Sequence, residues 1–101
     1  MATSTLKSNN LSLHIETLSV SNITISGNGG KTGEVAIPSV TGYKPVGIIG
    51  WEADAWEVAP SKLTTVVGGA KVWFSLANAA TSSKTVTFQM KVLYVPTSWT
   101  V

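Results

Sequence analysis

The stretch GYKPVGIIGW, residues 42–51, constrains the fold of this chain more than any other segment. It is strongly apolar, yet it contains three glycines and a proline. Each glycine inside a helix costs about 1 kcal/mol relative to alanine, so a helix is disfavoured. A short apolar run bounded by Gly and Pro is typical of a strand buried on both faces. A glycine there marks a bulge or the close approach of another backbone. We therefore expect a central strand. Gly47→Val or Gly50→Val should overpack its surroundings and destabilise the fold by about 1–3 kcal/mol.

On both sides of this stretch, apolar and polar residues alternate as they do in half-buried strands. Residues 11–16 are expected to turn their Leu and Ile side chains to the core and His14 to solvent. The alternation slips at Ser21-Asn22, as a bulge or a tight turn would produce. The most regular pattern, in residues 85–95, places five residues on one face: Val86, Phe88, Met90, Val92 and Tyr94.

Turn residues divide the chain into short strands. The glycine-rich residues 27–33 predict a hairpin turn, because glycine allows positive φ. Gly68-Gly69 predicts a second hairpin, and no segment has a helical period. Seven or eight short strands in this length predict an all-β fold, a single antiparallel, jelly-roll-like β-sandwich. We expect the sandwich to span residues 10–101, after a flexible N-terminal lead-in at residues 1–9.

Composition excludes several classes of function. Charged residues make up only 12% of the chain and the net charge is +2, without a clustered basic face, so we expect no nucleic-acid partner. Cysteine is absent, which excludes disulfides and thiolate metal sites and fits assembly in a reducing cytoplasm. The polar N-terminal residues predict no signal peptide, and no apolar run is long enough for membrane insertion. We expect no cofactor and no enzymatic activity.

Three apolar residues lie on strand faces that are otherwise polar. Leu93 and Val95 share a face with Thr87, Gln89 and Lys91, and Trp73 lies on the face that its strand gives to Lys and Ser. A half-buried strand of a monomer keeps such a face polar. Either loops cap this end of the sandwich, or the three residues contact another subunit. We take Trp73, Leu93 and Val95 as the candidate oligomer interface.

Residues 42–50, together with the terminal Val92-Leu93-Tyr94-Val95, resemble the small β-rich domains at the ends of phage and prophage tail or fibre proteins of Gram-positive bacteria. The resemblance extends from about Thr32 to Val95, and residues 51–60 depart from it with a Trp- and acid-rich loop. It implies a structural role in a virion, commonly as a trimer that contacts other virion proteins and sometimes host receptors such as surface glycans. It provides no catalytic residues.

The loop that departs from this pattern is the main candidate for a ligand site. Trp56 lies among Glu52, Asp54 and Glu57. An aromatic face beside carboxylates suits the C–H face and the hydroxyls of a sugar, so a monomeric carbohydrate-binding module is the alternative function. Two other readings stay open. Trp56 could fold back to cap the open end of the sandwich, and the acids could be solvated or hold a weakly bound cation, although we expect no metal site.

His14 is the only histidine in the chain. Ser12 and Glu16 share its strand face, which superficially resembles a catalytic triad. Neighbours on one strand face are about 7 Å apart along the strand, however, and do not form a triad. We therefore expect a solvated surface histidine and no catalytic site.

Overall fold

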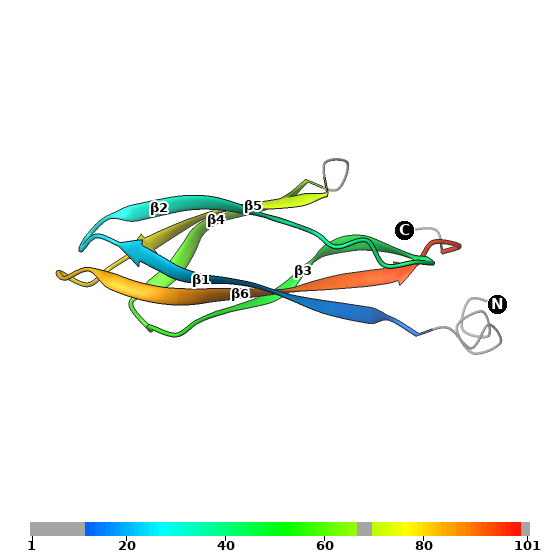
Figure 1. Cartoon of the computed structure of the whole chain (residues 1–101), viewed down its shortest axis with the longest axis horizontal. Coiled ribbons are helices and arrows are strands. Elements are labelled where there is room, and N and C mark those ends of the chain that lie inside the picture. The colour runs from blue at the N-terminus through cyan, green and yellow to red at the C-terminus, as the bar shows by residue number, and fades with distance from the viewer. Residues whose placement is uncertain (1–11, 67–69, 100–101) are drawn as a thin grey trace.

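The structure is a computed structural model that describes residues 12–66 and 70–99, and in these ranges the chain forms six strands in two antiparallel sheets (Figure 1). The long sheet has the order β1-β6-β3 and consists of β1 (His14–Ile25), β6 (Lys84–Pro96) and β3 (Tyr43–Ala53). The short sheet has the order β2-β5-β4 and consists of β2 (Gly30–Ala36), β5 (Lys71–Asn78) and β4 (Val58–Val66).

The expected all-β class is confirmed, and no helix occurs in the described ranges. The expected count of seven or eight strands is wrong, because β1 runs through the slip at Ser21-Asn22 as one strand with a bulge. Asn22 accommodates this bulge with a φ of 58°. The expected lead-in at residues 1–9 and Gly68-Gly69 lie outside the described residues.

The glycine-rich residues 27–33 do not form the expected hairpin. Only Gly27-Asn28 is a turn, and β2 already begins at Gly30. The strands on either side belong to different sheets, so the turn carries the chain from one layer to the other. The backbone N–H of Asn28 donates to the carbonyl oxygen of Ala80 (2.8 Å), which ties this turn to the connection between β5 and β6.

The hydrophobic core lies between the two sheets. It is centred on the regular strand β6, where the five residues expected on one face are all buried. The Phe74 ring of the short sheet meets the Phe88 ring of the long sheet at a centroid distance of 5.2 Å. The other buried core residues lie in β1 (Leu18, Ile23 and Ile25), β4 (Val58) and β5 (Val72 and Leu76). Ile37, directly after β2, is also part of the core.

The stretch at residues 42–51 is an edge strand, not the expected central one. β3 pairs only with β6, and Trp51 remains 45% exposed. The register shifts twice, between Pro45 and Gly47 and between Ile48 and Gly50, so the glycines mark two bulges. A Cβ at Gly47 or Gly50 would meet nothing within 4 Å. The expectation that Gly→Val overpacks these positions is therefore wrong.

The first half of β1 has the opposite orientation to the one expected. His14 pairs with Tyr94 and Leu18 pairs with Met90, without a register shift before Val20. Since side chains alternate strictly along an unbulged strand, His14 must share the inner face with Leu18. Leu13 and Ile15 then point outward and are 53% and 50% exposed.

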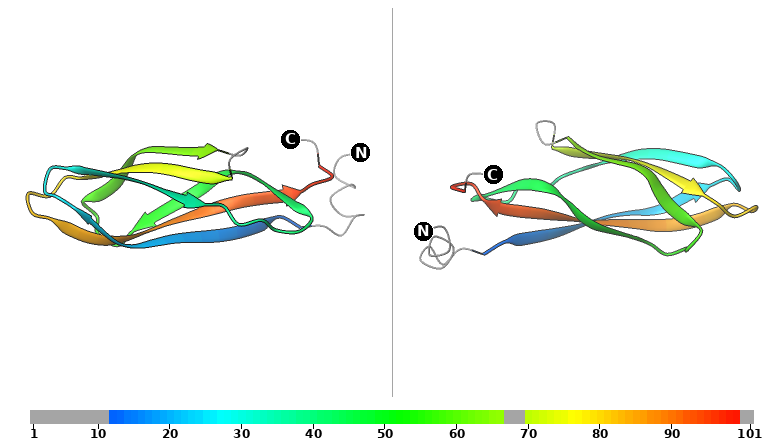
Figure 2. Two further views of the ribbon diagram at one scale, coloured as in Figure 1. Left: turned by 45° about the horizontal axis from the view of Figure 1, so that its top comes forward. Right: turned by 180° about the vertical axis from the view of Figure 1, so that it is seen from behind.

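The long sheet extends beyond the short sheet at the end where β1 begins and β6 ends (Figures 1 and 2). The molecule is correspondingly elongated, with extents of 54 × 24 × 18 Å. The connection between β2 and β3 runs along this extension. Its Ile37 is buried, and its Pro38 carbonyl accepts a hydrogen bond from the hydroxyl of Tyr94 (2.5 Å). This loop therefore covers the inner face that the short sheet leaves open.

Candidate functional site

The outer face of the long sheet carries a group of exposed aliphatic side chains over its extended half, bordered on the same face by Lys44 and Lys91. Ile15 of β1 and Gly47 of β3 both pair with Leu93 of the central strand β6, so the three positions form one row across the sheet. Leu13 precedes β1 next to this row and is half exposed. A bulge places two residues opposite one, so Val46 shares the position opposite Leu93.

The second bulge extends this apolar surface by one more residue. Ile49 lies with Gly50 opposite Lys91 and is 53% exposed. Beyond Lys91 the face becomes polar, with Gln89 between Ser19 and Glu52. We call the apolar half the outer patch, and it consists of Leu13, Ile15, Val46, Ile49 and Leu93.

The three residues predicted as an oligomer interface do not share one surface. Leu93 lies in the outer patch and is partly exposed. Val95 follows on the same face but is already buried at 4% exposure, and its neighbour Lys44 donates from Nζ to the Trp99 carbonyl oxygen (2.7 Å). Trp73 lies on the short sheet, with its side chain on the face opposite to the buried Phe74. A single contact surface therefore cannot contain all three.

The outer face of the short sheet has a different chemistry. Trp73 lies on the central strand β5, between Glu34 of β2 and Thr64 of β4, and is 51% exposed. A shallow hollow of about 380 Å³ lies beside it, lined by Thr32, Lys62, Thr64, Trp73, Phe74 and Ser75. Sequence reasoning missed this grouping because its members come from three strands whose pairing was unknown.

The acidic loop does not bring its carboxylates together. Asp54 Oδ1 accepts a hydrogen bond from the backbone N–H of Thr87 (3.0 Å), and Glu57 Oε2 lies 3.9 Å from Lys84 Nζ. Glu52 is exposed on the outer face of β3. In residues 12–66 and 70–99, no group of three or more His, Cys, Asp or Glu side chains could hold a metal ion.

Trp56 is the most exposed large hydrophobic residue in the described ranges, at 91%. It therefore does not cap the end of the sandwich, and that reading of the loop is wrong. Trp56 is not among the residues that line the hollow formed by its neighbours Glu52, Ala53 and Asp54 with Thr87 and Gln89.

His14 is half buried on the inner face, not on a solvated face as expected. Its Nε2 lies 2.5 Å from Glu16 Oε2, and its ring lies 5.5 Å from both the Tyr43 and the Tyr94 rings. Burial, together with the nearby charge of Glu16, raises the pKa of Tyr94 above its ordinary value. Ser12 contributes its carbonyl oxygen, as acceptor for the Tyr43 hydroxyl (2.9 Å). The group packs the extended end of the sheet and has no nucleophile–base pair.

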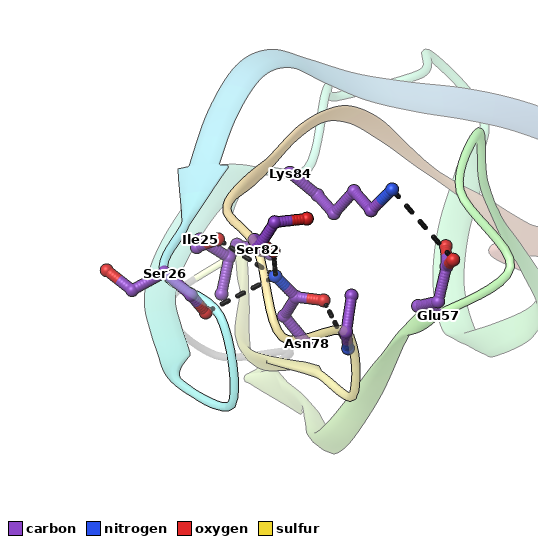
Figure 3. A network of polar contacts seen from close by, with 7 residues as sticks. Ile25, Ser26, Glu57, Asn78, Ser82 and Lys84 are labelled. Atoms are coloured by element: carbon purple, nitrogen blue, oxygen red, sulfur yellow. Dashed lines mark hydrogen bonds and ion pairs between the residues drawn. The ribbon is translucent and has the colours of Figure 1, made fainter.

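A buried amide organises the opposite end of the molecule. Asn78 is 2% exposed, and its Nδ2 donates to the carbonyl oxygens of Ile25 and Ser82 (both 3.0 Å; Figure 3). Its Oδ1 accepts from the backbone N–H of Ala80 (2.9 Å). Asn78 thus satisfies backbone groups at the end of β1 and in the connection between β5 and β6, and its role is structural.

Comparison with models of protein families, with curated proteins and with solved structures gives no match for this chain. No helix in the described part of the chain could span a membrane.

Proposed function

We propose that this chain is a non-enzymatic structural module that associates with copies of itself through the outer patch. The observation that carries this proposal is the concentration of exposed aliphatic side chains on one half of one sheet. Leu13, Ile15 and Ile49 are each exposed by half or slightly more. Full burial of such a side chain contributes about 1.5–3 kcal/mol, so covering the exposed half of all three contributes about 2–5 kcal/mol. Val46 and Leu93 add to this core.

The class of assembly that we propose is a phage or prophage virion, in its tail, fibre or head-associated parts. Residues 42–50 resemble the small β-rich domains of phage tail and fibre proteins, and this resemblance supports the class. The same residues form the two bulges that place Val46 and Ile49 in the outer patch. We favour a trimer as the stoichiometry, and other virion proteins as further partners. Assembly in the bacterial cytoplasm follows from this class.

The test is the oligomeric state of the purified chain. Size-exclusion chromatography with light scattering should give an oligomer at tens of micromolar, with three subunits in the favoured case. Ile15→Lys and Leu93→Lys should each release monomers, because a lysine in the centre of the patch must be desolvated. Ser19→Lys is the matched control, since it places the same charge on the polar part of the same strand face. A wild-type monomer at this concentration would refute the proposal.

The alternative is a monomeric carbohydrate-binding module that uses Trp56 and its acidic neighbours. The exposure of Trp56 favours it, because an uncovered indole face is available for stacking. Under this alternative, the wild-type chain is monomeric and Trp56→Ala abolishes glycan binding without loss of stability.

A further inference from the structure

The hollow beside Trp73 combines a fixed aromatic face with several hydroxyl groups. Trp73 belongs to the central strand of the short sheet, so a paired strand restrains the backbone on both sides. Its half-exposed indole offers an apolar face at little conformational cost. The rows next to it present short side chains, because Ser75 lies between Thr32 and Lys62. The indole therefore stands above its surroundings as one wall of the hollow.

The exposed lining of the hollow is mainly apolar, and polar side chains stand around it. Thr32, Thr64 and Ser75 each carry a hydroxyl that can donate and accept hydrogen bonds, and Lys62 adds a cationic donor. Glu34, on the other side of Trp73, is held by Lys71 Nζ at 2.7 Å from its Oε2 and provides an oriented acceptor. A volume of about 380 Å³ lies in the range of small-molecule sites.

The same face is poorly suited to a protein partner. Interface cores contain clusters of large apolar residues, whereas Trp73 is the one large exposed hydrophobic residue among the described residues of the short sheet. The outer patch, on the other sheet, has five aliphatic residues. A ligand with one apolar face and a hydroxylated edge fits the short sheet better than a second copy of this chain.

We propose that the hollow binds a pyranose unit of a glycan, with the C–H face of the sugar stacked on Trp73. The sugar hydroxyls bond to Thr32, Thr64 and Ser75, and Lys62 donates to a ring or hydroxyl oxygen. This inference goes beyond the proposed function and uses a different sheet, so one subunit can self-associate through the outer patch while the hollow stays open. Several weak sites on one oligomer would then act together, which raises the avidity well above the affinity of a single site.

The experiment measures binding of the full chain to a panel of immobilised mono- and oligosaccharides, followed by titration of the best sugar with detection by amide NMR shifts. We expect wild type to bind and the shifts to map to β2, β4 and β5. Trp73→Ala should weaken binding about tenfold, because it removes the aromatic face on which the sugar stacks. Trp73→Phe should retain part of the affinity.

Three variants make the result specific. Thr32→Arg fills the hollow without removing the indole and should also abolish binding. Ser19→Lys, on the long sheet, is the control and should bind as wild type does, whereas Trp56→Ala tests the acidic loop as the competing site. The proposal is overturned if wild type binds no sugar on the panel, or if Trp56→Ala loses binding while Trp73→Ala keeps it. The oligomeric state is read separately by light scattering, so a failure here leaves the proposed self-association standing.

Discussion

A methyl group added at Gly27 and one added at Gly47 should have opposite consequences. At Gly27, the new Cβ would overlap the backbone carbonyl of Thr81 and lie 2.9 Å from the backbone nitrogen of Ser82, whereas ordinary contacts are 3.4–4 Å. The clash is with backbone, which cannot rotate away, so the turn after β1 must separate from the connection between β5 and β6. That separation strains the hydrogen bond from Asn28 to Ala80 as well.

The magnitude follows from overpacking combined with a weakened hydrogen bond. Overpacking costs about 1–3 kcal/mol and the hydrogen bond contributes about 0.5–1.5 kcal/mol, so Gly27→Ala should cost about 2–4 kcal/mol. In a domain of this size, each kcal/mol lowers the melting temperature by about 4–8 °C. Gly33→Ala should fall between the extremes, because its Cβ would lie 2.6 Å from Cζ of the Phe74 ring, and a ring can shift further than backbone.

Gly47→Ala is the control, because its Cβ would meet nothing within 4 Å. It should be neutral or stabilise the fold by about 0.4–1 kcal/mol, through the reduced freedom of the unfolded chain. Thermal unfolding followed by circular dichroism measures all three variants. Equal melting temperatures for Gly27→Ala and Gly47→Ala would refute the close approach of the two connections, and a large loss at Gly47 would mean that β3 is covered after all.

Three further outcomes are expected. Asn78→Ala should destabilise by about 2–4 kcal/mol in denaturant unfolding, since it leaves buried backbone groups without partners; a change below 1 kcal/mol would contradict the network. Trp56→Ala should change stability by no more than about 0.5 kcal/mol, because its side chain is exposed. The pKa of Tyr94 is raised above 10.0, first by burial and then by Glu16. The protonated Tyr94 hydroxyl therefore makes its full contribution to folding stability below pH 10, and this contribution is lost as the pH rises through the folded-state pKa. Tyr94→Phe should reduce this alkaline loss in a series of melting temperatures against pH.

The strands of the core could be predicted from local patterns, and the sheets could not. In β5, and in β6 as far as Tyr94, the alternation is regular, so the buried face follows directly from the sequence. In β1 two phases compete, because both Leu13 with Ile15 and Leu18 with Val20 are apolar. The register with β6 decides between them, and this pairing joins residues that are far apart in the sequence.

The apolar character of β3 had two possible explanations. An apolar strand with glycines can be buried on both faces, or it can lie at an edge and expose apolar residues at bulges. The second is observed, since Val46 and Ile49 occupy bulges and are exposed. The hollow beside Trp73 was unpredictable for a related reason: Glu34 and Thr64 become its neighbours only through the pairing of β2 and β4 with β5.

The pairing of the first strand with the last has a consequence for synthesis. β6 contacts both β1 and β3, and it supplies the buried centre of the long sheet. The long sheet cannot form until residues 84–96 have left the ribosome. Pairings so distant in sequence must close long loops before they gain contacts, and all-β domains of this kind fold in about milliseconds to seconds. The nascent chain therefore carries β1 and β3 unpaired until residues 84–96 emerge, and any truncation before β6 leaves both strands without a partner.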